Sequence, residues 1–144
     1  MTHFDSIHAA DIQYVKSLDP DDQSIWDMDM PMESMCKYNY KYKGVPPTLL
    51  CYAIELYSMD VNRSNLEPII QYLFDNTKFD KYKQNIMGIN IFQEIRDNIE
   101  CLQYQVQQIL MRYSETEMEI IKNTAILQHI RSKILFLQSF LPRK

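Results

Sequence analysis

The side chains that most often carry catalysis or bind metals are few in this sequence and lie far apart. The histidines are His3, His8 and His129, and the cysteines are Cys36, Cys51 and Cys101. His3 and His8 have no cysteine or carboxylate at ligand spacing beside them, so we predict no metal site. Cys101 and His129 could meet as nucleophile and base, but they would lie in a seam between helices that gives a substrate no access.

Motifs of known catalytic chemistry are also missing. The chain has no Gly-x-Ser-x-Gly, no His-Glu-x-x-His and no phosphate-binding loop, and its only glycines are Gly44 and Gly88. The neighbouring carboxylates Glu94 and Asp97 have the spacing of a solvated helix face. We therefore predict a protein that is not an enzyme and that uses no cofactor.

The charge of the chain is unevenly distributed. The net charge is −4, yet the first 35 residues contain eight acidic side chains and one base, Lys16. Such a segment repels nucleic acid and anionic membranes unless it is folded away from them. The odd number of cysteines, with no Cys-x-x-Cys pair, favours a reducing cytoplasm, and Cys51 and Cys101 are predicted to be buried. No apolar run has the length of a signal peptide or a membrane span.

The elements that must position these groups are helices, and the clearest lie in the last third of the chain. Apolar residues there recur in alternating steps of three and four, which is the spacing of helices packed along a seam, as in a coiled coil. The runs are Phe92, Ile95, Ile99, Leu102, Val106, Ile109, Tyr113 and then Leu127, Ile130, Ile134, Leu137, Leu141. We predict one helix over 89–112 and a second from Ser114 to Pro142, joined by a short turn and therefore antiparallel.

The second of these helices is apolar over more than a narrow seam. Ser114 and Glu117 form a capping box at its predicted start. The apolar residues outside the seam are Ile120, Ile121, Ile126, Leu135, Phe136 and Phe140. They must pack on the N-terminal helices or on another subunit, and we favour packing within the chain.

Shorter helices are predicted in the N-terminal half. Residues 2–18 form one helix, or two divided near Ala10, with a cap at Thr2 or Asp5. The buried stripe of this segment is Phe4, Ile7, Ile12, Val15 and Leu18. The Asp-Pro-Asp-Asp sequence at 19–22 ends the segment, because proline cannot continue the helix.

Two further helices follow. One begins after Thr48 and buries the apolar residues of 49–57, because Thr48 stands where a helix N-terminus needs an oxygen acceptor. The next is capped by Asn65, carries Pro68 in its first turn, and ends at 75–77.

These two helices are similar to an ankyrin repeat. Thr48, Leu50 and Ala53 stand at the spacing of the Thr-Pro-Leu-His-x-Ala opening of that repeat. Residues 66–76 resemble its second helix, and residues 11–18 resemble the second helix of a preceding unit.

The resemblance covers about residues 3–80. It departs from the family at Leu49 and Cys51, which replace the usual proline and histidine, and at the loop 58–65, which is longer than the repeat allows. It implies a protein of the style found in large DNA viruses or intracellular bacterial effectors. The alternative is two ordinary antiparallel helices with a capping threonine.

Together these signals predict an all-α fold with residues 1–144 in a single domain. An ankyrin-like or irregular helical layer over 1–83, containing an acidic loop at 19–36, precedes a long antiparallel helical hairpin over 84–144.

The acidic loop alternates acidic residues with large apolar ones, among them Trp26, Met28 and Met30. One interpretation is an exposed linear motif that docks into a groove of a partner protein. The alternative is a segment whose tryptophan and methionine side chains cover the core of their own domain.

Residues 37–43 alternate Lys or Asn with Tyr, so a strand here would place Tyr38, Tyr40 and Tyr42 on one face. Bases interleaved with aromatic rings can neutralise a nucleic-acid strand and stack on its bases. The same pattern is typical of an exposed edge strand.

We therefore predict a non-enzymatic protein–protein interaction module of the cytoplasm, or of the host cytoplasm if it comes from a pathogen. The expected partner-binding residues are Trp26, Met28, Met30, Tyr38, Tyr40 and Tyr42. One alternative is a homodimer that pairs through the heptads of 92–141. Another is nucleic-acid binding through 37–43 and the lysines of 78–83, which the acidic N-terminal segment disfavours.

Overall fold

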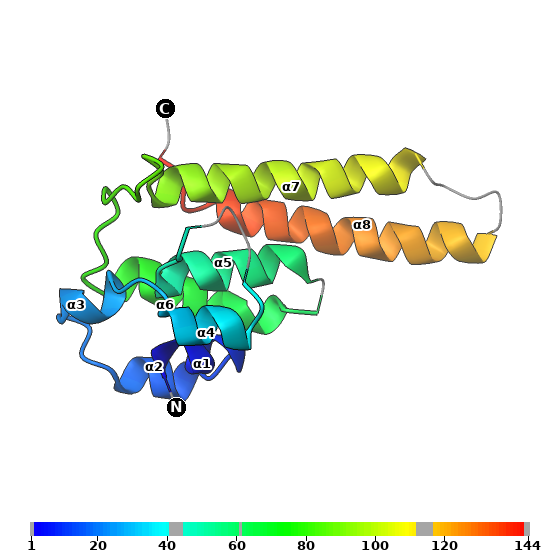
Figure 1. The fold of residues 1–144 in the computed structure, drawn as a ribbon. Helices are drawn as coiled ribbons and strands as arrows, with labels where there is room; N and C mark the ends of the chain where they lie inside the picture. The colour runs from blue at the N-terminus through cyan, green and yellow to red at the C-terminus, as the bar shows by residue number, and fades with distance from the viewer. Residues whose placement is uncertain (1, 41–44, 61, 112–116, 143–144) are drawn as a thin grey trace.

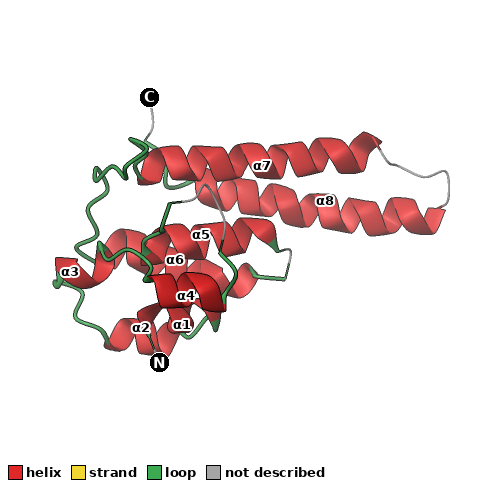
Figure 2. Cartoon of the chain, in the orientation of Figure 1, coloured by secondary structure: helices red, strands yellow, loops and turns green. Residues whose placement is uncertain are grey.

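The protein is described by a computed structural model over residues 2–40, 45–60, 62–111 and 117–142, with the side chains of 117–123 left undescribed. These ranges contain helices and no strand, which confirms the predicted all-α class (Figure 1, Figure 2). The elements in chain order are α1 (His3–His8), α2 (Ile12–Ser17), α3 (Gln23–Trp26), α4 (Met32–Lys37), α5 (Leu49–Met59), the 3-10 turn η2 (Ser64–Leu66), α6 (Glu67–Asn76), α7 (Ile91–Met111) and α8 (Glu117–Gln138).

The two long helices α7 and α8 lie side by side and run in opposite directions (Figure 1). The seam residues at most 5 % exposed are Ile95, Ile99, Leu102, Leu127, Ile130 and Leu137. The hairpin predicted from the apolar spacing is therefore confirmed. Tyr113 and the capping box predicted at Ser114 lie outside the described residues.

Side-chain caps begin two helices where the sequence predicts them. On α1, Thr2 Oγ1 accepts a hydrogen bond from the Asp5 backbone N–H at 3.2 Å, and the Asp5 carboxylate accepts one from the Thr2 N–H at 2.8 Å. On α5, Thr48 Oγ1 accepts from the Cys51 N–H at 3.4 Å. Each cap satisfies a backbone donor that the first helical turn leaves without a partner.

The break between α1 and α2 falls at Ala10, as predicted for the two-helix alternative. Ala10 donates its N–H to the Ile7 carbonyl at 3.0 Å, and Asp11 donates to the Ser6 carbonyl at 2.9 Å. These two bonds form a Schellman motif, which requires a left-handed residue, and Ala10 has a φ of 55°. The Asp11 carboxylate then accepts from the Tyr14 N–H and starts α2.

The start of α6 differs from the prediction. Asn65 does not cap it, because Asn65 lies inside the 3-10 turn that leads directly into the helix, and the N-cap is Leu66. Leu66 is fully buried, so core packing sets this junction in place of a side-chain cap. Pro68 lies in the first turn, and the helix ends at Asn76, both as predicted.

Helix α5 packs against α1 and against α7, and thus connects the N-terminal layer to the hairpin. Phe136 of α8 contacts Tyr57 of α5 with ring centres 5.5 Å apart, and Phe140 contacts Phe74 of α6 at 4.7 Å. Phe136 and Phe140 therefore pack within the chain, as predicted, whereas Leu135 stays exposed, and the side chains of Ile120 and Ile121 lie outside the described residues. Figure 1 shows the outer ends of α7 and α8 extending past α5.

Candidate functional site

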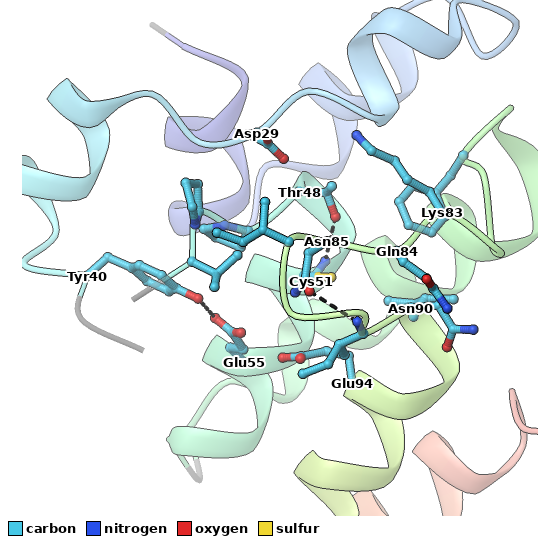
Figure 3. Close-up of a pocket in the computed structure, with 17 residues that line it drawn as sticks. Asp29, Tyr40, Thr48, Cys51, Glu55, Lys83, Gln84, Asn85, Asn90 and Glu94 are labelled. Carbon is cyan, nitrogen blue, oxygen red and sulfur yellow. Dashed lines mark hydrogen bonds between the residues drawn. The ribbon is translucent and has the colours of Figure 1, made fainter. Parts of the chain in front are cut away.

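A cavity of about 230 Å³ lies where α5 meets the start of α7 (Figure 3). Its walls come from segment 45–48, the first two turns of α5, the connector 83–90 and the first turn of α7. Four polar side chains, Tyr40, Cys51, Glu55 and Glu94, gather around it (Figure 3). The cavity therefore combines parts of the N-terminal layer and of the hairpin.

Two buried carboxylates form the floor of this cavity. Glu55 of α5 is 4 % exposed and Glu94 of α7 is 5 % exposed. Tyr40 donates its hydroxyl to Glu55 Oε2 at 2.5 Å, and the Asn98 side-chain amide donates to Glu94 Oε1 at 3.3 Å. A buried carboxylate is costly unless hydrogen bonds or a cation compensate the lost water, so two in one cavity are an unusual concentration of negative charge.

The prediction that Glu94 lies on a solvated helix face is wrong. The residues of α7 that face α5 include Ile91, Glu94 and Asn98, and all three are buried. Asp97, which directly precedes Asn98 in the sequence, stays half-exposed and accepts a hydrogen bond from the Gln93 side chain at 2.9 Å. The contact with α5, which no local pattern reveals, decides which of the two carboxylates is buried.

The Cys51 thiol and the Tyr40 hydroxyl of the cavity are held in their protonated forms. Burial raises the pKa of the Cys51 thiol to about 12, and the nearby Glu94 carboxylate adds to this rise. Burial, together with the Glu55 carboxylate, holds the pKa of Tyr40 well above its ordinary value. Because a protonated thiol is a poor nucleophile, the cavity offers hydrogen-bond acceptors and negative charge in place of nucleophilic chemistry.

The connector between α6 and α7 forms one rim of the cavity. Asn85 Oδ1 accepts hydrogen bonds from the backbone N–H groups of Met87 at 2.8 Å and Ile89 at 3.1 Å, which bend the chain tightly. This turn leaves Ile86 87 % exposed and Met87 65 % exposed. At the start of the connector, Lys83 Nζ donates to the Asp27 carbonyl at 2.8 Å and ties the rim to the N-terminal layer.

Comparison with known protein families, curated proteins and solved structures gives no match to this chain. The ankyrin resemblance of residues 3–80 thus stays a prediction.

No helix within the described ranges is both long enough and apolar enough to cross a membrane.

The acidic segment 19–36 holds its tryptophan in the core. It contains the short helices α3 and α4, and Trp26 is 1 % exposed, with its ring N–H donating to the Asp19 carbonyl at 3.1 Å. Met30 is 2 % exposed, its N–H donates to the Pro47 carbonyl at 2.8 Å, and Met28 is half-buried. The interpretation as an exposed docking motif is wrong, and the alternative, a cover for the core, is what the structure contains.

The predicted strand at 37–43 is also absent from the part of this segment that is described. Lys37 ends α4, and Asn39 has a φ of 52°, which no strand residue adopts. Tyr40 donates its N–H to the Met35 carbonyl at 2.9 Å, so a second Schellman motif ends the helix here. Residues 41–43, including Tyr42, lie outside the described residues.

The tyrosines of this segment that are described point to different places. Tyr38 stacks on His8 with ring centres 4.1 Å apart and donates to the Asp5 carboxylate, while Tyr40 reaches the cavity. Lys37 pairs with Asp5 at 3.0 Å. The rings of Tyr38 and Tyr40 both lie 6.1 Å from the Tyr52 ring and both hydroxyls bind carboxylates, so these two side chains make their contacts within the chain.

The histidines and cysteines are dispersed. No group of three His, Cys, Asp or Glu side chains in the described residues is arranged to hold a metal ion. Cys101 is exposed, so the prediction that it is buried is wrong, because it lies on the side of α7 away from the seam. His129 Nε2 lies 3.2 Å from Ser64 Oγ, at the contact of α8 with η2.

Sequence reasoning missed the cavity because its floor residues come from positions 40, 51, 55 and 94. One local signal was present: Glu55 stands between Ile54 and Leu56 in an otherwise apolar helix. A charged side chain in such a helix is either exposed to solvent or buried with hydrogen-bond partners. Only the packing of α7 against α5 shows which of the two applies to Glu55.

Proposed function

We propose that this protein is a non-enzymatic protein-interaction module whose binding site is the cavity between α5 and α7 with its rim at Ile86 and Met87. The observation that carries the proposal is that Ile86 lines the cavity while it and its neighbour in sequence, Met87, are largely exposed. Apolar anchors next to a pocket are the usual centre of a protein interface. The ankyrin resemblance supports the same class of function, with a host protein in the cytoplasm as the partner it implies.

Contacts within the chain make the alternatives weaker. The apolar seam of 92–141 is largely filled by the pairing of α7 with α8, so a second copy is not needed to cover it. Tyr40 is bound to Glu55, so its ring and hydroxyl are not displayed for a base, and Lys37 already has a carboxylate partner in Asp5 although its side chain is 60 % exposed.

Capture of a partner from cell lysate tests the proposal. We expect the wild type to retain specific proteins that the double variant Ile86→Ser, Met87→Ser loses. Leu135→Ser is the matched control, because Leu135 is a 68 % exposed apolar residue on α8 that does not line the cavity. Equal capture by the double variant and the control would refute the binding site.

A homodimer remains a second candidate because of one observation. The projecting part of α7 carries Tyr104 and Met111, which are 61 % and 80 % exposed. Light scattering after size exclusion tests it: a mass that stays monomeric at all concentrations removes the dimer, and a Tyr104→Ser variant should dissociate it if it exists.

A further inference from the structure

We infer that the cavity between α5 and α7 binds a basic side chain, arginine or lysine, which a partner protein inserts. The inference rests on the proposed function and names the group of the partner that enters the site. It is carried by the charge, the shape and the wall chemistry of the cavity.

The charge of the cavity favours a cation. Its charged lining residues within the described chain are Asp29, Glu55, Glu94 and Lys83. Lys83 directs its ammonium group to the Asp27 carbonyl, whereas Glu55 and Glu94 are buried, at most 5 % exposed. Because opposite charges attract more strongly where water is excluded, a cation gains most beside these two carboxylates.

The walls of the cavity suit the stem of a long basic side chain. The apolar residues that line the cavity are Val45, Pro46, Pro47, Phe79, Ile86, Ile89 and Ile91. Lysine and arginine carry three or four methylene groups below a charged tip, and they bury that stem against apolar surface. An acidic side chain would be repelled by the two carboxylates, and an apolar one would gain no charge–charge attraction to them.

The volume of the cavity also suits a basic side chain. The cavity of about 230 Å³ is larger than one basic side chain requires and too small for a folded element. The exposed Ile86 and Met87 beside its mouth can then pack against the residues that flank the inserted side chain. This arrangement, an anchor in a pocket with apolar contacts around it, is typical of interface hot spots.

Short peptides test the inference directly. The probes are acetyl-Ala-Arg-Ala-amide and its lysine analogue, with the citrulline peptide as the neutral control of nearly the same shape as arginine. We expect one of the basic peptides to bind with a Kd about tenfold lower than the citrulline peptide, since a charge-assisted contact is lost. In amide NMR spectra the shifts should concentrate at 48–55 and 85–94. Equal binding of all three peptides, or shifts elsewhere, would overturn the inference.

Matched variants locate the site. Glu55→Gln and Glu94→Gln keep the shape of each side chain and remove its charge, and each should abolish the preference for the basic peptide. Glu100→Gln makes the same change at an exposed position of α7 and should leave the preference intact. If either cavity variant lacks the helical circular dichroism of the wild type and is therefore unfolded, the comparison of the three peptides on the wild type still tests the inference.

The outcomes separate the inference from the proposed function. Loss of partner capture in the Ile86, Met87 double variant without any preference for basic peptides would leave an interaction site and refute the cationic anchor. Tight binding of spermidine without binding of the basic peptides would also refute it, because the ligand would then be a free polyamine.

Discussion

Lys133 joins the hairpin to the N-terminal layer at the carbonyl end of α5. Its Nζ donates to the Tyr57 carbonyl at 2.6 Å and to the Asp60 carbonyl at 2.7 Å, and it lies 4.3 Å from the centre of the Tyr57 ring. Carbonyls at the end of a helix lack helical donors, and a cation there also compensates the helix dipole. Lys133 is 1 % exposed, and burial lowers its pKa to about 8.

Replacing Lys133 by Met keeps most of the buried stem and removes both hydrogen bonds. Because two helix-end carbonyls lose their donor, we expect the free energy of unfolding to fall by about 2 kcal/mol. Urea unfolding followed by circular dichroism at neutral pH measures this. Arg131→Met, at an exposed position of the same helix, should change the value by less than about 0.5 kcal/mol. An unchanged stability of the Lys133 variant would contradict the role given to this side chain.

The stabilities of the wild type and of the Lys133→Met variant should depend differently on pH. The pKa of Lys133 is about 8 in the folded protein and near 10.5 when unfolded, so between these values the unfolded chain binds more protons. Stability from this residue therefore rises with pH over that window. We expect the stability difference between wild type and Lys133→Met to grow from about pH 8 to pH 10. Tyrosines begin to titrate near the upper end of this window, but both proteins contain the same ones, so their effect cancels in the difference. A difference that stays constant would show that the lysine titrates normally.

The three cysteines should differ sharply in reactivity. Cys36 and Cys101 are exposed, whereas burial raises the pKa of Cys51 to about 12. Because the thiolate is the reactive form, alkylation of Cys51 by iodoacetamide at mildly basic pH should be about a thousandfold slower than that of an ordinary thiol. Mass spectrometry of the digested protein identifies the labelled sites. Labelling of all three at similar rates in the folded protein would contradict the raised pKa of Cys51, which is half-buried.

Two short helices, α1 and α4, end in the same way. Each is closed by a Schellman motif whose left-handed residue is not glycine: Ala10 has a φ of 55° and Asn39 a φ of 52°. Asparagine tolerates this conformation better than alanine does, because its side chain can hydrogen-bond locally. The strain is therefore concentrated at Ala10, between α1 and α2.

Ala10→Gly should stabilise the protein by about 0.5–1 kcal/mol, because it relieves the left-handed strain. The measurement is the midpoint of urea unfolding. Ala9→Gly is the matched control: Ala9 has a φ of −81°, so the same change there brings no relief and should destabilise. Destabilisation by both changes would mean that the backbone at Ala10 is unstrained.

The N-terminal layer and the hairpin share one set of packing contacts. Phe136 and Phe140 of the hairpin lie against Tyr57 and Phe74, and Lys133 adds a polar link. Trp26 is the only tryptophan, and it is buried in the N-terminal layer. Its fluorescence therefore reports on that layer, whereas α7 and α8 contribute a large share of the circular dichroism.

We expect both signals to change at the same urea concentration, because the two parts would lose each other's packing when either unfolds. Ile95→Ala, in the fully buried part of α7, should lower both midpoints together through a loss of about 2–5 kcal/mol. Two separate transitions would show that the layer and the hairpin unfold independently, and would contradict the single domain predicted for 1–144.

The sequence pattern predicted the structure of the hairpin correctly but left the environment of Trp26 open. The regular spacing from Ile95 to Leu102 specifies a helix face by itself, because residues three and four apart meet on one side of any helix. The alternation of acidic and apolar residues around Trp26 has no such unique meaning. Trp26→Ala, which would test an exposed motif, is now expected to lower stability because the ring is buried.

Local signals thus determined α1, α2, α5, α6 and the antiparallel hairpin, with the caps at Thr2 and Thr48 and the break at Ala10, but they did not predict α3 and α4. Each depends on residues a few positions apart, whose interactions form wherever the chain is helical. The meeting of Glu55 with Glu94, the burial of Lys133 and the exposure of Cys101 were decided by the tertiary structure alone. They depend on how α5, α7 and α8 are rotated against one another, and that rotation is set by the packing of the whole core.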